Sequence, residues 1–174
     1  WLEFRRVLFR SDQQDAKAVH EFESVRLLQQ IQAFNEGIDP TLGELSDKKT
    51  FIFAGAAADP SCKNKRSLEN RIRKKKEAGA GFIQTQMIME KENLIEFCEK
   101  ISTPLEIPVI AGVFLLKSYK NALFINKYVP GACIPENILS RLKDAKEPLE
   151  EGIKIAAEQA HDFINIANGI HIMA

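Results

Sequence analysis

The sequence predicts an α/β fold in which four parallel strands and their helices form about half of a (β/α)8 barrel. Short apolar runs alternate with amphipathic helices, an order that produces right-handed βαβ units. The segment 78–86 passes from small residues into a buried strand that ends on the polar side chains Gln84, Thr85 and Gln86. Barrel strands end in this way where their carboxyl edge forms a functional site. The chain has 174 residues, fewer than the roughly 250 of a whole barrel.

The first half of the chain is expected to hold two helices and two strands. Apolar residues recur every three positions from Phe22 to Ile31 and predict a helix that Gly37 ends. The continuous apolar run 50–57 predicts a strand that is buried on both faces. Ser67 is expected to cap a helix that runs to about residue 78, and a strand over 82–86 follows it.

The second half repeats this alternation. A helix is predicted over 90–101, a strand over 107–114, and a further helix from Ser118 to about residue 125. A short helix follows the loop around Pro135. A strand over 169–174 closes the chain, and both ends are expected to be cut. Spacings of four and three predict a long amphipathic helix before that strand, with the apolar stripe Leu149, Ile153, Ala156, Ala160 and Phe163.

Composition narrows the classes of function. Lys and Arg total 24, as do Asp and Glu, so the net charge of zero gives no reason to expect nucleic acid or an anionic membrane as a partner. The three cysteines are far apart and odd in number, which is typical of reduced thiols and not of a disulfide framework or a zinc site. No apolar run approaches the roughly 20 residues of a membrane span. We therefore expect a cytoplasmic protein without a metal.

Residues 1–11 differ in character from the rest of the chain. The stretch 3–11 resembles the translation of a common sequencing-library adapter. The alternative is a basic amphipathic arm. We expect 1–11 to be an artefact and assign 12–174 to the protein's own domain.

Several motifs, in order and at consistent spacing, resemble the methylenetetrahydrofolate reductase family. The resemblance covers nearly everything from about Asp12 onward and implies a (β/α)8 barrel of which the four strands are numbers five to eight. Residues 12–174 would then be the C-terminal half of that barrel. The motifs are Gly55-Ala-Ala-Ala-Asp-Pro60, Arg71 with Lys74-Lys75, the segment 78–86, Pro108-Val-Ile-Ala-Gly-Val113 with Leu116-Lys-Ser118, Val129-Pro-Gly131 with Ile134-Pro135, Glu151-Gly152, and Gly169-Ile-His-Ile-Met-Ala174.

The resemblance implies a flavoprotein with FAD across the carboxyl face of the barrel. A nicotinamide or other donor reduces the flavin, and a hydride then passes to methylenetetrahydrofolate to give methyltetrahydrofolate. The expected partners are the folate and the electron donor, and the parent protein is expected to form a homo-oligomer or a fusion to a homocysteine methyltransferase domain. The family's general-acid glutamate and flavin-tuning aspartate lie outside this sequence, so we expect the chain by itself to be inactive.

Two residues are implied to bind the folate. Gln86 matches the family glutamine that bonds the pterin ring, and a carboxamide offers the donor and the acceptor that a pterin edge needs. Tyr119 corresponds to an aromatic position that covers the substrate's ring system. The alternatives are a glutamine that bonds loop backbone and a tyrosine that packs at a helix N-terminus.

Five residues are implied to bind FAD. Lys75 matches a family lysine at the ribityl-phosphate part, and Arg71 and Lys74 lie near it on one helix. The alternative is that this charge run is a solvated helix face. Gly55 and Ala56 lie where the family strand ends beside the flavin, and small side chains let backbone approach a flat ring. Tight helix–strand packing is the alternative for them.

Two other functions stay open at this point. One is a different pterin- or phosphate-binding barrel enzyme, which would carry a phosphate-binding glycine loop after the seventh or eighth strand. The segment 115–118 is not rich in glycine. The other is a non-catalytic barrel subunit that binds a partner protein.

Overall fold

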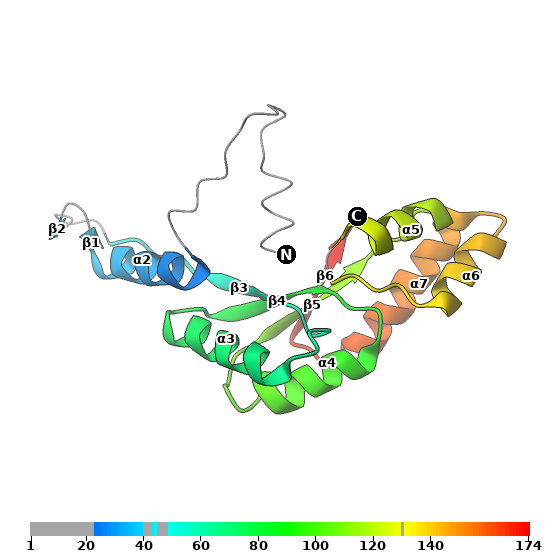
Figure 1. The fold of residues 1–174 in the computed structure, drawn as a ribbon. Coiled ribbons are helices and arrows are strands. Elements are labelled where there is room, and N and C mark those ends of the chain that lie inside the picture. Colours follow the sequence, from blue (N-terminus) through cyan, green and yellow to red (C-terminus); the bar gives the residue numbers. More distant parts are fainter. Residues whose placement is uncertain (1–22, 40–42, 45–48, 130) are drawn as a thin grey trace.

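A four-stranded parallel sheet forms the centre of the protein (Figure 1). The computed structural model describes residues 23–39, 43–44, 49–129 and 131–174. The strand order is sequential, and helices follow the first three strands. The predicted α/β alternation is therefore confirmed. The strands are β3 (Gly55–Ala58), β4 (Phe82–Met87), β5 (Val109–Phe114) and β6 (Gly169–Met173).

The helices are those that the sequence pattern predicts, with adjusted ends. Two short antiparallel strands, β1 (Ile38–Asp39) and β2 (Gly43–Glu44), follow the first helix. The helices are α2 (Ser24–Glu36), α3 (Lys65–Glu77), α4 (Lys91–Phe97), a π-helical turn η1 (Cys98–Ser102), α5 (Tyr119–Tyr128), α6 (Glu136–Asp144) and α7 (Pro148–Phe163).

Two apolar cores hold the helices to the sheet. The first, here called the sheet core, joins strand residues such as Ile83, Val109 and Ala111 to α3, α4 and α7. The second, here called the rim core, lies where strands β4 and β5 end and joins them to α5, α6 and α7. Its members are Met87, Leu116, Ala122, Ile125, Val129, Ile134, Ile138, Leu139, Leu142 and Ile155.

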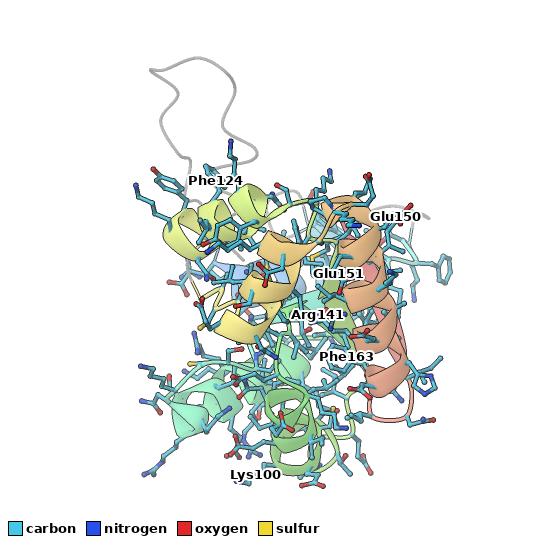
Figure 2. The ribbon with its side chains drawn as sticks, turned by 90° about the vertical axis from the view of Figure 1, so that its right-hand side faces the viewer. Lys100, Phe124, Arg141, Glu150, Glu151 and Phe163 are labelled. Carbon is cyan, nitrogen blue, oxygen red and sulfur yellow. The ribbon has the colours of Figure 1, made fainter. Side chains whose placement is uncertain are left out.

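An ion-pair cluster ties α6 to α7. Figure 2 shows Arg141 of α6 close to Glu151 of α7. Arg141 Nε donates to Glu151 at 2.8 Å, and its two terminal nitrogens donate to both carboxylate oxygens of Glu158 at 2.6 and 3.0 Å. A planar guanidinium suits this two-bond geometry, so the pair fixes the direction of the two helices as well as their distance.

Two helix boundaries confirm the sequence signals. Gly37 ends α2 with φ of +84°, in the left-handed region that glycine adopts without strain. Ser118 caps α5, because its hydroxyl accepts a hydrogen bond from the Asn121 amide at 3.1 Å. Phe22, the first residue of the predicted α2 stripe, and the proposed artefact 1–11 lie outside the described residues.

The predicted strand over 50–57 is wrong in its first half. Only 55–58 pair with β4, and Phe51 is 95% exposed. The backbone of Ile52 instead bonds through its amide and its carbonyl to the side chain of Asn35 on α2. An amide side chain thus satisfies the groups that a neighbouring strand would otherwise pair.

Three further expectations need correction. Asn64, and not Ser67, caps α3: its side chain accepts from the Ser67 amide at 3.0 Å. The helix predicted over 90–101 becomes π-helical at Cys98. On α7, Ala156 and Phe163 are buried as predicted, but Leu149 and Ile153 are exposed, and the helix also buries Gly152, Ile155 and Gln159.

Other features of the described residues bear on the class of protein. None of their helices is both long enough and apolar enough to cross a membrane. Their acidic, histidine and cysteine side chains form no group of three or more that could hold a metal ion. Cys62, Cys98 and Cys133 are free thiols.

Candidate functional site at the carboxyl edge of the sheet

Gln86 lies at the carboxyl end of β4, where it is 3% exposed. Its Oε1 accepts a hydrogen bond from the amide of Met87 at 3.0 Å. That bond uses one lone pair and leaves the second lone pair and the NH2 group of the carboxamide for other partners. Because the strands are parallel, this edge is also where β3, β5 and β6 end.

The pairing of β4 with β5 shifts register beside Gln86. From Gln84 to Met87 the chain advances three residues, while the paired positions on β5 advance only two. The strand therefore contains a β-bulge that includes Thr85 and Gln86. Bulges often re-aim side chains next to functional sites, and here the bulge lies at the predicted folate-binding residue.

Thr85 is 1% exposed and forms hydrogen bonds in two directions. Its Oγ1 accepts from the amide of Gly112 on β5 at 2.8 Å and donates to the carbonyl oxygen of Gln86 at 2.8 Å. A Cβ atom on Gly112 would lie 2.8 Å from the carbonyl oxygens of both residues, so this approach requires glycine. Spacing along the sequence does not reveal Thr85, since its partner belongs to the next strand.

Tyr119 begins α5, directly after the turn that follows β5. Its half-buried side chain packs against the rim core, which includes Met87, the neighbour of Gln86. The two predicted folate-binding residues thus come from consecutive βα units and lie at one end of the sheet. Tyr119 contacts the core that contains Met87, the residue after Gln86, and the roles of Tyr119 and Gln86 stay predictions.

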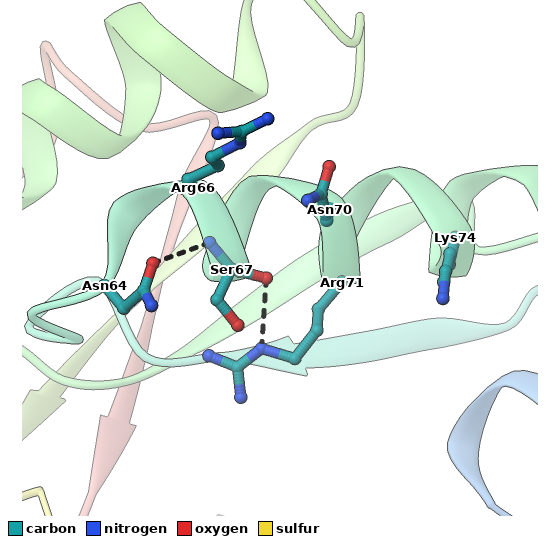
Figure 3. Close-up of a pocket in the computed structure, with 6 residues that line it drawn as sticks. All are labelled: Asn64, Arg66, Ser67, Asn70, Arg71 and Lys74. Atoms are coloured by element: carbon teal, nitrogen blue, oxygen red, sulfur yellow. Dashed lines mark hydrogen bonds between the residues drawn. The ribbon is translucent and has the colours of Figure 1, made fainter.

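An open cationic pocket of about 360 Å³ lies along α3 (Figure 3), and all of its lining residues belong to this helix and its N-cap. In the close-up, Arg71 and Lys74 extend from one side of the helix and Arg66 from the other. Neither Arg71 nor Lys74 has an ion-pair partner among the described residues, and no carboxylate of that part of the chain lines the pocket. The lining residues are Asn64, Arg66, Ser67, Asn70, Arg71 and Lys74.

Lys75 lies apart from this pocket although it is next to Lys74 in the sequence. It is 8% exposed, and its Nζ donates to the carbonyl oxygen of Ala57 on β3 at 2.6 Å. Burial, and secondarily the charge of Arg71, lowers the pKa of the Lys75 ammonium. Its ammonium therefore binds strand backbone near the carboxyl edge, on the strand that α3 follows.

Gly55 and Ala56 have different surroundings on β3. A Cβ atom on Gly55 would lie 2.2 Å from the ring of Phe82, so an aromatic ring of the chain itself already occupies the close approach that glycine allows. Ala56 packs against the sheet core. Both residues thus have packing neighbours within the chain, and their roles beside a flavin stay predictions.

Gln84 and His171 form a polar contact that sequence reasoning did not predict. Gln84 Nε2 lies 2.5 Å from His171 Nδ1, and both side chains are half-buried. The two residues belong to β4 and β6, the strands on either side of β5. The contact bridges the strand between them. His171 pairs with Gly112, which in turn pairs with Met87, so the Gln84 side chain meets a residue that lies level with the carboxyl end of β4.

Comparison with known proteins bears on what this arrangement is. Residues 13–174 match the family described as methylenetetrahydrofolate reductase. An uncharacterized protein from Clostridium thermocellum, whose solved structure is described as binding two copies of 5-methyl-5,6,7,8-tetrahydrofolic acid, is 20% identical with a TM-score of 0.59. That match covers 98% of this chain and 60% of the other. No curated protein matches the sequence. Since the family match extends over nearly the whole chain, the protein belongs to the methylenetetrahydrofolate reductase family.

Proposed function

We propose that this chain contributes the folate-binding residues and part of the flavin-binding surface of an FAD-dependent methylenetetrahydrofolate reductase. The reaction converts 5,10-methylenetetrahydrofolate to 5-methyltetrahydrofolate, with a nicotinamide or other electron donor. The proposal rests on the position of Gln86 at the carboxyl end of β4 and of Tyr119 at the start of α5, the helix that follows β5 in the same parallel sheet. Enzymes built on (β/α)8 barrels place their sites at this edge.

The folate half of the proposal rests on the chemistry of Gln86 and Tyr119. The Met87 amide occupies one acceptor position of the Gln86 carboxamide, and the remaining donor and acceptor suit the amide-like edge of a pterin. An aromatic ring such as that of Tyr119 stacks well on a flat heterocycle. The solved structure that is described as binding 5-methyl-5,6,7,8-tetrahydrofolic acid supports a folate as the ligand.

The flavin half of the proposal rests on the cationic pocket. A diphosphate needs cationic or hydroxyl donors, and Arg71, Lys74 and Ser67 offer them without a competing carboxylate from the described residues. The residues present therefore fit FAD, which would supply the hydride when bound. The Lys75 ammonium is bound to Ala57, so we assign Lys75 to fixing α3 against β3 beside the flavin.

The sequential strand order also supports the proposed barrel. α3, α4 and α7 all pack on the sheet core, as the outer helices of a (β/α)8 barrel do. We propose that β3 to β6 are its strands five to eight. The chain spans 60% of the similar solved structure. We propose that the general acid of the reaction lies outside these four βα units.

Spectroscopy of the full-length protein tests the proposal. We expect a yellow protein with the absorbance of bound FAD. When its flavin is reduced without oxygen, addition of methylenetetrahydrofolate should reoxidise it and release methyltetrahydrofolate. A colourless full-length protein that takes up no FAD would overturn the proposed function, as would a flavoprotein whose reduced form does not react with the folate.

A further inference from the structure

The side chain of Thr85 forms hydrogen bonds within the β-bulge of β4. Between Gln84 and Met87 the strand carries one residue more than β5 opposite it. The Thr85 hydroxyl lies in this irregular stretch. It accepts a hydrogen bond from the Gly112 amide and donates one to the Gln86 carbonyl oxygen. Both bonds are 2.8 Å long, and Thr85 is 1% exposed. Water therefore cannot easily replace either bond.

The two bonds of Thr85 determine where the backbone of Gln86 lies. The Gln86 carbonyl is held from one side by the hydroxyl, while Gly112 approaches from β5 so closely that a Cβ atom would lie 2.8 Å from that carbonyl. The next amide along the chain, that of Met87, bonds the Gln86 side chain. The backbone and the carboxamide of Gln86 are thus both fixed within two residues of the bulge.

We propose that Thr85 is a positioning residue for the folate: its hydroxyl holds the bulge that aims the Gln86 carboxamide at the pterin. This inference rests on the proposed function, because it takes the folate as the ligand of Gln86. Thr85 does not touch the ligand in this account. It acts through Gln86, and its requirement is a hydroxyl that can donate and accept at the same time.

The chemistry of the hydroxyl gives a sharp set of variants. Thr85→Ser keeps the donor and the acceptor, while Thr85→Val keeps the shape and loses both. In Thr85→Val the Gly112 amide and the Gln86 carbonyl are left unpaired in a buried place, which favours a different backbone path. Thr85→Cys is an intermediate case, since a thiol is a weak donor and a weak acceptor.

The affinity of the full-length protein for 5-methyltetrahydrofolate is the measurement. We expect Thr85→Val to weaken binding about tenfold, the loss of one buried hydrogen-bonded arrangement. Thr85→Ser should bind as the wild type does. FAD content should be the same in all variants, because the cationic pocket lies on α3. A purely structural role predicts instead that FAD content and the melting temperature fall together with folate affinity.

A double-mutant cycle with Gln86→Ala separates this inference from the proposed function. If Thr85 acts through Gln86, then Thr85→Val has no further effect on folate affinity once Gln86 is alanine. Additive effects would overturn the positioning role, and so would wild-type affinity in Thr85→Val or weak binding in Thr85→Ser. If Thr85→Val is insoluble, Thr85→Cys takes its place in the cycle. Wild-type folate affinity in Gln86→Ala would instead overturn the proposed function of Gln86.

Discussion

Gly152 on α7 lies against the backbone of Leu116: a Cβ atom at position 152 would be 1.8 Å from the Leu116 carbonyl oxygen. Leu116 belongs to the turn between β5 and α5, so the long helix contacts directly the turn that leads to Tyr119. Only a residue without a Cβ atom permits this close approach of helix and turn. Gly152 is buried in the first half of α7.

Gly152→Ala is therefore expected to destabilise the protein although alanine favours helix formation. Overpacking of this kind costs about 1–3 kcal/mol, more than the roughly 1 kcal/mol that a helical glycine-to-alanine change otherwise gains. The melting temperature should fall by several degrees in differential scanning calorimetry. Gly169→Ala is the matched control, because the nearest atom to its added methyl group is 3.9 Å away. Equal melting temperatures for the two variants would contradict the close contact.

Gln86→Ala is expected to weaken 5-methyltetrahydrofolate binding by about 10- to 100-fold, the effect of leaving a ligand's polar edge unpaired. Isothermal titration of the full-length protein measures it. Gln84→Ala removes the same side chain two residues earlier, where the partner is His171. This control should keep its folate affinity. A loss of affinity in Gln84→Ala equal to that in Gln86→Ala would show a general disturbance of β4.

Arg71→Ala and Lys74→Ala are expected to weaken FAD retention, because each removes from the pocket on α3 a cation that forms no ion pair with the described residues. The difference in FAD retention between variant and wild type should become smaller as the salt concentration rises. Salt screens the exposed charges of the wild type, so their contribution to FAD binding is reduced there too. Flavin fluorescence after gel filtration gives the bound fraction. Arg73→Ala is the control, because Arg73 already forms an ion pair with Glu69 at 2.5 Å. The Arg73→Ala variant should retain FAD as the wild type does.

Arg141→Gln is expected to cost about 1 kcal/mol of stability at neutral pH, a small value because the ion pairs are partly exposed. The hydrogen bond from Arg141 lowers the pKa of Glu158, so this contribution is complete above the ordinary glutamate pKa and is lost as the pH falls through the lowered value. Urea unfolding of both proteins at a series of pH values measures the difference. The two stabilities should converge in acid, and a constant offset would contradict the ion-pair explanation.

Local signals in the sequence predicted the elements but not all of their edges. Gly37 and Ser118 act through their own backbone and side chain, so the ends that they mark were predictable. The start of α3 was not predictable in this way, because Asn64 and Ser67 are both residue types that cap helices well. In the structure the Asn64 side chain accepts the hydrogen bond from the first turn, so α3 begins three residues earlier than a Ser67 cap would place it.

Long-range contacts account for the errors. The apolar run before β3 reads as a buried strand, yet the Asn35 side chain takes the place of a strand partner for Ile52. The buried face of α7 contains Gly152, which lies against Leu116, where the prediction had Leu149 and Ile153. Spacing alone contains neither fact, since both depend on residues from another element.

The candidate site was predictable in part for the same reason. Polar residues at the end of a strand indicated the site at the carboxyl edge, and the resemblance to the family indicated Gln86, Arg71 and Lys74. The sequence did not reveal that Lys75 is buried against Ala57, or that Thr85 closes a bulge with Gly112. Pairing register is decided between strands, and a single strand's sequence does not contain it.

The extra residue in β4 makes the length of this strand a constraint on evolution. If one residue between Gln84 and Met87 were deleted, regular pairing would place Gln86 directly opposite Ala111. Paired residues of parallel strands point to the same face, and Ala111 is fully buried in the sheet core. The carboxamide would enter an apolar interior without a partner. Homologues that keep the glutamine are therefore expected to keep the length of this strand as well.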